Sequence, residues 1–511
     1  MEQFIVKHQD KIMGMISCFD RMVFKGYLPI SYPESMERFL NRQGILFKDF
    51  KRFVSLCSDT VKDHAIEVAR KAGRPFEYLN TPVRKEERAR MIAQRDGVTQ
   101  GLICIFSCVE ACQSFKLKYG EGKPRLAPSS PRCLCLYFYY LDREFGFMHV
   151  RIQTWFPFTV QVYINGHEWL ARKMTQHGIG YVQVENAFTH IDDCPRAQRL
   201  ADRFVKKDFP RILEAFAHKV NPLLKDLLHG MHHYWVADQA EYATDILFKD
   251  RAALKNLYPQ LLRHATVCFS AEDVLTFLGR KLNGNFQGEV MNSFKKRWPG
   301  ARVKHRMKGN WIKMYDKHGC VLRIETVINH PYEFRVRRQG KRQGEWVMGW
   351  YPMAKRVSNL YRYAEVCWSA NRAYLDALAV IDDPAQAYRL LNEVCAPVTK
   401  NGRRRRGLNP LRQDDVALFA AVLRGEHFIH GFRNRDLAAH LGMAYAKDPA
   451  ERKRQSARVT RLLQLLHAHH LIAKIPRTRR YRLTLKGATL MSAAVYLYHE
   501  DVHTLLKAKA A

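Results

Sequence analysis

Hydrophobic and polar residues alternate most regularly between residues 133 and 164, which predicts strands. Three runs in this region are dense in aromatic and β-branched residues, at 133–141, 146–155 and 158–164. A helical pattern over 167–178 and a further strand pattern over 181–193 follow. Strand, strand, strand, helix, strand is typical of an α+β fold. We therefore predict an α+β protein with a mixed or antiparallel sheet and helical insertions.

The remaining patterns divide the chain into four parts. Residues 1–130 read as an N-terminal α+β region, with a hairpin over 14–30 and helices over 34–73 and 85–97. Residues 131–395 form a central basic α+β domain that is mainly helical over 196–285 and 358–394. Four consecutive arginines with Gly, Asn and Pro predict a linker over 396–410. Residues 411–511 form the last domain.

A second hairpin is predicted over residues 311–329, with its turn at 316–319. Its second strand carries Arg323 and Glu325 between apolar neighbours. Burying an unpaired carboxylate costs several kcal/mol, roughly, so Glu325 needs a partner. That partner is Arg323, another cation or a metal ion.

Twelve cysteines are present without a C-x-x-C motif. Cys104, Cys108 and Cys112 recur at steps of four, which predicts one face of a helix, while Cys133 and Cys135 alternate as strand residues do. We expect the cysteines to pack as small apolar side chains. A metal or cluster site is the less favoured alternative.

The chain is strongly basic, with 84 Lys and Arg against 49 Asp and Glu and a net charge of +35. The excess is spread along the whole sequence, which favours a polyanionic partner because each neutralised phosphate releases counterions. We expect nucleic acid, with DNA favoured and RNA as an alternative. No apolar run is long enough to span a membrane, and the N-terminus lacks the pattern of a secretion signal. We expect a cytoplasmic protein with no membrane partner.

The C-terminal region carries the most specific pattern. The pattern begins with a helix and a short helix and continues over 451–475 with a long helix that enters a strand. A basic turn and a returning strand follow. This order, closing with HHLIAKIPRTRRYRLTLKG, resembles winged-helix DNA-binding domains over about residues 411–495. The resemblance implies a helix that enters the major groove with Arg454, Arg458 and Arg461 on its polar face. It implies a wing whose tip carries Arg477, Arg479 and Arg480, next to the linker residues Arg403 and Arg404. Winged helices also serve as protein-contact modules, in which an arginine face is merely solvated.

Two basic stretches flank the 311–329 hairpin, at 295–309 and 335–346. We predict one phosphate-binding surface from them, with Trp298 and Trp346 able to stack on unpaired bases. A solvated rim with core tryptophans is the alternative. The phosphate-binding candidates are Lys304, Arg306, Lys308, Arg337 and Arg338.

Metal-dependent nucleases and strand-transfer enzymes need two or three carboxylates that converge on divalent ions. Asp20, Asp142 and Asp193 stand at predicted strand ends, and Glu325 lies within a strand. The order of elements over 133–193 is compatible with a ribonuclease-H-like catalytic core, as in many transposases. His149 lies across a predicted turn from Asp142, where the two would complete a metal site with Glu168. The metal candidates are Asp142, His149 and Asp193, and the expected ion is Mg²⁺ or Mn²⁺. Acidic residues at strand ends are also common turn formers.

KMYDK and LRIE, at residues 313–317 and 322–325, resemble the strand pair Y-[DN]-K…L-R-x-E of phage and plasmid rolling-circle replication initiators. The resemblance covers about residues 303–336 and implies that Glu325 lies near a DNA-processing site and that Tyr315 is a nucleophile. The His-hydrophobic-His motif of those enzymes does not occur on a predicted strand. A structural pair between Arg323 and Glu325, bonded to Lys313, is the alternative.

Other stretches, such as FMHVRIQTWFPF and GHEWLARKM, are similar to uncharacterised bacterial proteins associated with mobile elements. The sequence therefore predicts a nucleic-acid-binding protein that processes DNA as a transposase-like or replication-initiator-like enzyme. Two rivals remain, a non-catalytic DNA-binding regulator or initiator and an RNA-binding component of a ribonucleoprotein.

Overall fold

A computed structural model describes residues 1–511 apart from 81–83, 120–123, 268, 270, 280–289, 297–300, 343, 380–386, 401, 426, 428–430, 444–447, 477 and 500–511. The chain forms two compact units. The N-terminal unit comprises residues 14–245 and 327–365, and the C-terminal unit comprises residues 1–13, 246–326 and 366–511. Both units combine helices with strands, and the strands form a large mixed sheet, so the α+β prediction is confirmed as a fold class.

The strands of the N-terminal unit follow the order β11-β1-β8-β7-β6-β3-β2. Their bounds are β1 Ile12–Tyr27, β2 Phe76–Tyr78, β3 Gly101–Ala111, β6 Arg132–Asp142, β7 Gly146–Gln153, β8 Val160–Asn165 and β11 Tyr234–Phe248. β2 runs parallel to β3, whereas the pairs β3–β6, β6–β7, β7–β8 and β8–β1 are antiparallel. The three strands predicted over 133–164 are therefore confirmed as β6, β7 and β8.

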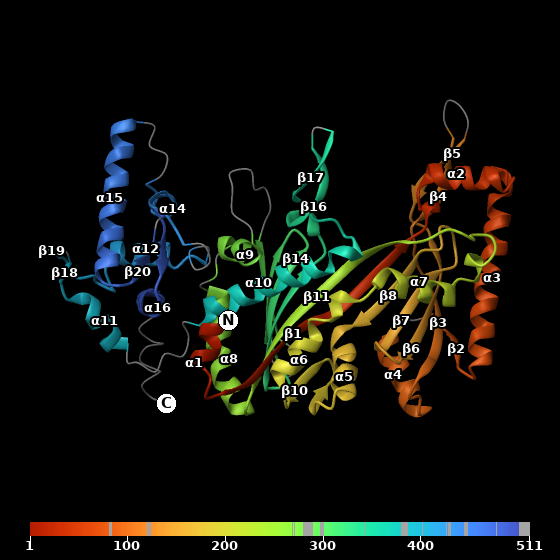
Figure 1. Ribbon diagram of the computed structural model, residues 1–511, viewed down its shortest axis with the longest axis horizontal. Coiled ribbons are helices and arrows are strands. Elements are labelled where there is room, and N and C mark those ends of the chain that lie inside the picture. The colour runs from red at the N-terminus through yellow and green to blue at the C-terminus, as the bar shows by residue number, and fades with distance from the viewer. Residues whose placement is uncertain are drawn as a thin grey trace. The chain divides into compact units, whose positions relative to one another are not determined.

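Six helices of this unit are α2 Pro33–Arg42, α3 Phe50–Lys71, α4 Lys85–Arg95, α5 Gly166–Gln176, α6 Cys194–Ala201 and α7 Phe209–Val220. α3 and α4 pack on β3, α5 packs on β7, and α7 packs on β7 and β8 (Figure 1). Three separate ribbons complete the unit: β4 Ser114–Lys118 with β5 Arg125–Ser129, β9 Tyr181–Val184 with β10 Ala187–Ile191, and β16 Arg335–Arg342 with β17 Glu345–Pro352.

The C-terminal unit contains the sheet order β12-β13-β14-β15, with β12 Val290–Lys296, β13 Ala301–Met307, β14 Asn310–Lys317 and β15 Val321–Ile328. The predicted hairpin over 311–329 is confirmed, and Gly319 takes the positive φ that its turn requires. The remaining helices of this part are α1 Glu2–Lys7, α8 Arg251–Val267, α9 Ala271–Phe277, α10 Leu360–Leu378 and α11 Ala387–Cys395. α8 and α9 pack on β13.

The last part of the chain folds as α12 Gln413–Val422, α14 Asn434–His440, α15 Pro449–Ala468, β20 Ile472–Lys474, β21 Tyr481–Leu483 and α16 Leu485–His499. The apolar side of α15 packs into a core, in which Val459, Leu463, Leu465 and Leu466 are buried and Leu462 is partly buried. The predicted linker is structured in part. It forms the hairpin β18 Val398–Lys400 with β19 Arg403–Arg405, and Lys400 Nζ donates to the carbonyl of His467 over 2.9 Å.

Four local predictions were wrong. Residues 14–27 of the predicted hairpin lie in the single long strand β1, and a 3-10 helix follows at Pro29–Ser31. Asp20 lies within the strand, because Asp-Arg at its centre has no turn-forming glycine. Cys104 and Cys108 lie on strand β3, not on a helix, since a step of four satisfies both periods. The single strand over 181–193 is the ribbon β9–β10. Within 196–285, the strand β11 replaces the expected helix.

No helix among the described residues is both long enough and apolar enough to cross a membrane.

Candidate functional site

Two buried carboxylates meet on neighbouring strands of the N-terminal unit. Asp20 lies in the middle of β1 and Glu241 in the middle of β11, and their side chains contribute carboxylate oxygens within 4.8 Å of each other. Only 1% of Asp20 and 6% of Glu241 is exposed. Two like charges this close in a protein interior require protons, cationic neighbours or a metal ion to balance them.

The side chain of Asp20 is held in a fixed orientation by two asparagines. Asn165 Nδ2 donates to Asp20 Oδ1 over 2.9 Å, and Asn186 Nδ2 contacts both oxygens, at 3.1 and 3.0 Å. Asn165 is also the N-cap of α5, where its Oδ1 accepts from the amide of His167 over 2.8 Å. One side chain therefore fixes both the start of the helix and the carboxylate.

A histidine connects Asp20 with a third buried acid. His167 is fully buried, with Nδ1 at 3.4 Å from Asp20 Oδ1 and Nε2 at 3.4 Å from Asp245 Oδ2. Asp245 lies on β11, four residues after Glu241, and therefore on the same face of that strand. The three acids and the imidazole form a compact polar cluster, which we call the carboxylate cluster (Asp20, His167, Glu241 and Asp245).

The acidic residues of the carboxylate cluster affect the pKa of the neighbouring Arg21. Burial opposes the charge of Arg21, yet the acidic groups around it, Asp20 and Glu241 among them, raise its pKa above the ordinary value. Hard oxygen ligands at this separation fit Mg²⁺ or Mn²⁺, which prefer carboxylates to nitrogen or sulfur. Asp20 and Glu241 would hold such an ion.

Asp142, His149 and Asp193 occupy structural positions outside this cluster. Asp142 Oδ1 accepts from the amides of Glu144 and Phe145, at 2.8 and 3.0 Å, and closes the β6–β7 turn. Asp193 is the N-cap of α6 and accepts from the amide of Arg196 over 2.8 Å. Among the described residues, neither aspartate nor His149 belongs to a group of three potential metal ligands.

His149 is enclosed by aromatic rings. Its ring stacks on Tyr163, with centroids 4.9 Å apart and planes at 6°, and lies 5.0 Å from the ring of Tyr139. Burial, helped by the positive charges of Arg151 and Lys85, lowers the pKa of His149 to about 3. The half-buried imidazole is therefore neutral at neutral pH and packs as an aromatic ring.

Glu325 has the partners that its burial demands. In the C-terminal unit, Lys313 Nζ and the hydroxyl of Tyr315 both donate to its carboxylate, each to a different oxygen. Lys313 and Tyr315 are two residues apart on β14, which lies beside β15, so both reach across to the same acid. This arrangement confirms Lys313 as a partner of Glu325 and gives Tyr315 a structural role.

The ribbon β16–β17 carries cations and aromatic rings on one face. The cross-strand pairs Arg337–Trp350, Gln339–Met348 and Lys341–Trp346 alternate with the pairs of the other face. We call this side the ribbon face; it comprises Arg335, Arg337, Gln339, Lys341, Trp346, Met348 and Trp350. Trp346 is 66% exposed and Trp350 is 55% exposed, and Lys341 Nζ lies 5.7 Å from the Trp346 ring.

A tyrosine on the opposite side of the ribbon explains why residue 340 is a glycine. The ring of Tyr351 covers Gly340, and its hydroxyl donates to the carbonyls of Gly340 and Val347 over 2.9 and 3.1 Å. A Cβ on Gly340 would meet the Tyr351 ring at 2.4 Å. Tyr351 therefore clamps the ribbon from one side and leaves the ribbon face open. Arg338 lies on the clamped side, over the Tyr351 ring at 4.8 Å.

A second basic and aromatic face lies on β13 and β14 of the C-terminal unit. Lys304 and Arg306 pair with Lys313 and Trp311 across the two strands, and Lys304 Nζ lies 3.8 Å from the Trp311 ring. Arg306 and Lys308 are exposed, whereas Val303, His305 and Met307 point into the core. The stretch 295–309 therefore contributes cations from one strand face. Trp298 lies outside the described residues.

The long helix α15 presents the arginines predicted for a recognition helix. Arg454, Arg458 and Arg461 are exposed at spacings of four and three. Arg454 pairs with Glu451 over 3.2 Å, whereas Arg458 and Arg461 form no ion pair with a described residue. Arg461 borders a hollow of about 550 Å³ together with Lys453, Ser456, Ala457 and Thr460.

The elements around α15 hold it in place and add further cations. Asn434 of α14 donates to Ser456 O and Thr460 Oγ1, at 2.9 and 2.8 Å. Arg403 and Arg404 are exposed on β19, and Arg479 and Arg480 lie in the turn between β20 and β21. Arg477 lies outside the described residues.

Sequence reasoning missed Glu241, His167 and Trp350. Glu241 was hidden because its strand was read as helix, and His167 because it follows a helix cap instead of a metal-binding motif. The alternation of WVADQAEYATDILF, with Glu241 and Asp245 at even spacing, is the signal that was available. Trp350 could have been found by assigning the turn between β16 and β17, because the strand pairing then puts Trp350 opposite Arg337.

No protein-family model, no curated protein and no solved structure matches this chain.

Proposed function

We propose that this chain binds nucleic acid and processes the DNA of a mobile element, with Mg²⁺ or Mn²⁺ held by carboxylates of the N-terminal unit. The ribbon face is the observation that carries the proposal. Two exposed tryptophans on one face stand opposite cations of the neighbouring strand, which is the chemistry of a surface that stacks unpaired bases and holds their phosphates. An isolated two-stranded ribbon with large exposed apolar side chains is marginally stable in water, which favours a partner on that face.

The cations of the ribbon face are available to phosphates. Among the described residues, Arg335, Arg337 and Lys341 form no ion pair with a carboxylate. The tryptophans lie on the same face at alternate cross-strand pairs. Successive bases would stack on their rings while the phosphates contact the cations. The proposed ligand of this face is single-stranded DNA.

The ribbon is tested by replacing both tryptophans. Trp346→Ala with Trp350→Ala removes the stacking rings, and each base–ring stack contributes about 1–3 kcal/mol. We expect binding of a labelled deoxythymidine oligonucleotide to weaken tenfold or more, roughly. Tyr332→Ala, which removes an exposed ring elsewhere in the same unit, serves as the matched control and keeps full affinity. Equal affinity in the double variant and the native chain refutes the ribbon as a binding face.

The order α12, α14, α15 and the hairpin β20–β21 supports a winged-helix role for the C-terminal region. In such domains a long helix lies in the major groove and the hairpin touches the backbone. Arg458 and Arg461 face outward on α15, and Arg479 and Arg480 stand at the hairpin turn. We infer that this region holds duplex DNA while the ribbon holds an unpaired strand. A protein that processes DNA needs both kinds of contact at a junction.

The carboxylate cluster supports phosphodiester chemistry. A divalent ion bound by Asp20 and Glu241 would supply Lewis acidity toward a phosphate oxygen. Asn165 and Asn186 orient Asp20, and His167 links Asp20 to Asp245, so the ligands keep their geometry without the ion. Buried ligands with fixed orientation are what a catalytic ion requires.

Cleavage or strand transfer in the presence of Mn²⁺ tests the enzymatic part. Asp20→Asn and Glu241→Gln are expected to abolish metal-dependent turnover of labelled duplex and single-stranded DNA. Asp142→Asn and Asp193→Asn are matched controls, because asparagine keeps their turn and cap hydrogen bonds, and both are expected to retain turnover. Activity that survives in the Asp20 and Glu241 variants contradicts this assignment.

A non-catalytic DNA-binding regulator is the second candidate. The observation that favours it is the depth of Asp20 and Glu241, since buried acids held by asparagines also serve purely structural roles. Binding without any metal-dependent turnover in the native chain selects this candidate. Preference for RNA oligonucleotides of the same sequence selects a ribonucleoprotein component instead.

A further inference from the structure

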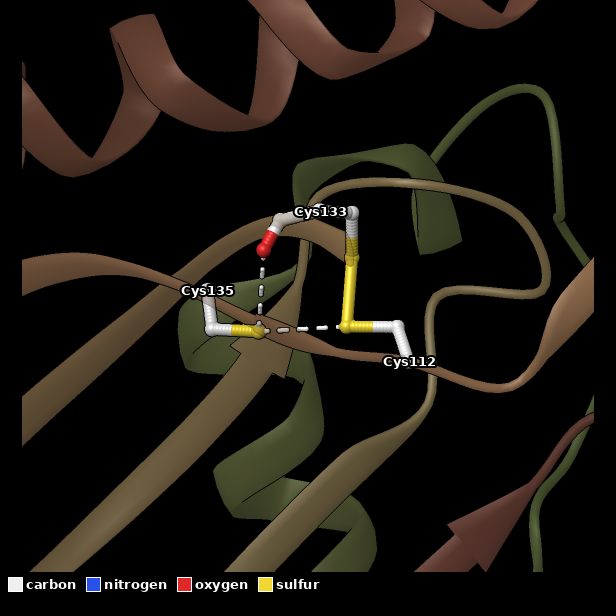
Figure 2. Close-up of side chains that lie close together, drawn as sticks. All are labelled: Cys112, Cys133 and Cys135. Atoms are coloured by element: carbon white, nitrogen blue, oxygen red, sulfur yellow. Dashed lines mark hydrogen bonds between the residues drawn. A yellow bond between two sulfur atoms is a disulfide. The ribbon is translucent and has the colours of Figure 1, made fainter. Parts of the chain in front are cut away.

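Three cysteine sulfurs converge at one end of strands β3 and β6. Cys112 follows β3, whereas Cys133 and Cys135 lie on β6, two residues apart and on the same face. The ligand atoms of all three lie within 4.8 Å of one another, and the sulfurs of Cys112 and Cys135 are 3.4 Å apart. Figure 2 shows Cys112 and Cys133 joined as a disulfide, with the thiol of Cys135 beside Cys112. We call these residues the sulfur cluster.

The sulfur cluster lies in a nearly closed environment. Cys112 is 3% exposed, Cys133 is 9% exposed and Cys135 is fully buried. Metal–sulfur bonds of about 2.3 Å in a tetrahedral arrangement set sulfur atoms a little under 4 Å apart. The 3.4 Å between the sulfurs of Cys112 and Cys135 is close to that separation, and reduction of the disulfide releases Cys133 to reach it. Closed thiolate sites of this kind bind Zn²⁺ and other soft ions in preference to Mg²⁺ or Ca²⁺.

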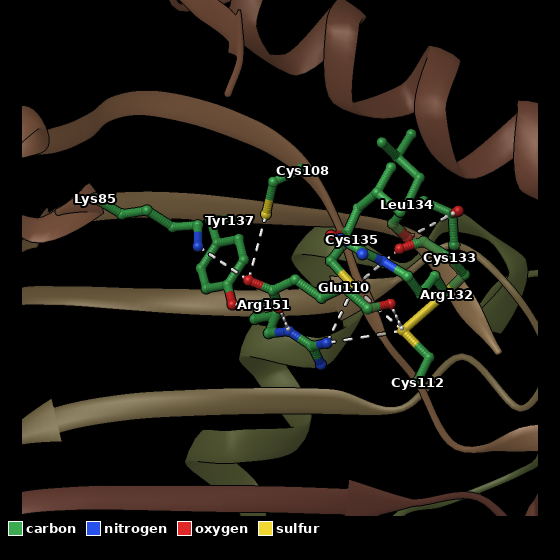
Figure 3. Close-up of polar contacts among 12 residues, drawn as sticks. Lys85, Cys108, Glu110, Cys112, Arg132, Cys133, Leu134, Cys135, Tyr137 and Arg151 are labelled. Atoms are coloured by element: carbon green, nitrogen blue, oxygen red, sulfur yellow. Dashed lines mark hydrogen bonds and ion pairs between the residues drawn. A yellow bond between two sulfur atoms is a disulfide. The ribbon is translucent and has the colours of Figure 1, made fainter. Parts of the chain in front are cut away.

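A buried guanidinium is aimed at the sulfurs. Arg151 of β7 donates Nη2 to Cys135 Sγ over 3.0 Å and approaches Cys112 Sγ at 3.8 Å (Figure 3). Its Nε bonds to Glu110 Oε2 over 3.1 Å. A cationic donor this close to sulfur stabilises a thiolate more than a neutral thiol.

The partly buried charges beside the sulfur cluster, apart from the exposed Arg132, leave one positive charge in excess. Among the described side chains in this ion-pair network, Glu110 carries the negative charge and faces two cations, Arg151 and Lys85, whose Nζ lies 2.9 Å from Glu110 Oε1. The hydroxyl of Tyr137 also donates to Glu110 over 2.8 Å. Three thiolates with a divalent ion carry one negative charge together, and this cancels the excess. A monovalent ion on the same thiolates would overcompensate it.

We propose that the reduced sulfur cluster is a soft-metal site in which Cys112, Cys133 and Cys135 bind Zn²⁺, with a non-protein ligand in the fourth position. The Cys112–Cys133 disulfide and the metal site are two states of the same sulfurs. A cellular dithiol gives two electrons and two protons to the disulfide and is itself oxidised to a disulfide. Zn²⁺ then displaces three thiol protons and forms three sulfur–metal bonds.

The binding site joins the residue that follows β3 to the first residues of β6. In the metal-bound state Cys112 is tied to both β6 cysteines through the ion, whereas the disulfide ties it to Cys133 alone. The proposal stands on the sulfur geometry and the charge balance around it, so it is independent of nucleic-acid binding.

The experiment uses the full chain purified with a phosphine reductant and without chelator. Metal content is measured by mass spectrometry, and Co²⁺ is added to metal-free protein to record thiolate-to-cobalt charge-transfer absorption. We expect one equivalent of Zn²⁺ per chain and a charge-transfer band with Co²⁺. Protein oxidised to the disulfide is expected to bind neither ion until reductant is added.

Cys135→Ala is expected to abolish the charge-transfer band, and Cys104→Ala is the matched control. Cys104 is also a buried cysteine of β3 but lies outside the sulfur cluster, so its variant keeps the band. Circular dichroism establishes that both variants are folded. If Cys135→Ala does not fold, thiol titration of the native chain in the presence and absence of Zn²⁺ replaces it, with three thiols protected by the ion. Folded native protein that gives no charge-transfer band, or three thiols that stay reactive with Zn²⁺ present, overturns the proposal.

Discussion

Buried ionisable residues in this chain lie among specific partners, and those partners decide what each residue can do. Asp20 has two asparagines and a histidine, Glu325 has Lys313 and Tyr315, and His149 has aromatic rings. The same residue types therefore lead to a candidate metal centre in one case and to structural groups in the others. The difference lies in whether the neighbours already neutralise the charge.

His149 is expected to make stability depend on pH. Its pKa is about 3 in the folded chain and near the ordinary 6.5 when unfolded, so the unfolded state binds the extra proton between these values. Stability is fully present above the unfolded pKa and is lost as pH falls below about 6.5. His149→Phe removes this dependence of stability on pH. Urea titrations of both proteins between pH 7 and 4 check it, and an unchanged pH slope contradicts the assignment of a neutral, enclosed imidazole.

Glu325→Gln is expected to destabilise the C-terminal unit by about 3 kcal/mol, because it leaves Lys313 without its buried counter-charge. Lys313→Met in the same chain is expected to recover a large part of that loss. The free energy of unfolding in urea, measured for the two single variants and the double variant, gives the coupling. Additive changes in the free energy of unfolding would mean that the Lys313–Glu325 pair contributes nothing to stability. The burial of Glu325 would then need another explanation.

At the scale of elements, strong alternation and turn chemistry predicted the sheet well. β6, β7, β8 and the hairpin β14–β15 were found because aromatic and β-branched residues alternate between clear turns. β3 was missed because a repeat of four fits both a helix face and a strand face. β11 was missed because Ala, Glu and Gln favour helix locally, and pairing within the sheet overrides that preference.

The candidate site was predictable only in part for the same reason. Asp20 was a candidate from the sequence, but Glu241 could not be placed beside it while its strand was assigned as helix. Asp142 and Asp193 were chosen because acids at strand ends suit metal binding, yet the same position suits turns and helix caps, and the structure places them there. Sequence alone does not separate these uses, because they depend on which amide or metal lies within reach.

The helix α15 is expected to contribute phosphate contacts that salt can measure. Arg458→Ala and Arg461→Ala each remove one exposed cation without touching the buried face of the helix. Each is expected to weaken duplex DNA binding and to reduce the slope of log affinity against log salt by roughly one. Lys71→Ala on α3 is the control. If both arginine variants keep the native slope, α15 does not contact phosphates.

At the scale of the whole molecule, several elements expose positively charged side chains. The ribbon face, the β13–β14 face and α15 each expose cations, and two of them combine cations with aromatic rings. A chain of this charge is costly to fold unless a polyanion offsets the repulsion between its cations. We therefore propose that nucleic acid contacts more than one of these cationic elements.

The most direct test is the affinity of the full chain for labelled single-stranded and duplex DNA across a series of salt concentrations. The account predicts tight binding at low salt and a linear fall of log affinity with log salt. The predicted slope corresponds to several phosphate contacts, roughly 0.7 to 0.9 per contact. Absence of binding at low salt, or affinity that does not change with salt, would contradict it.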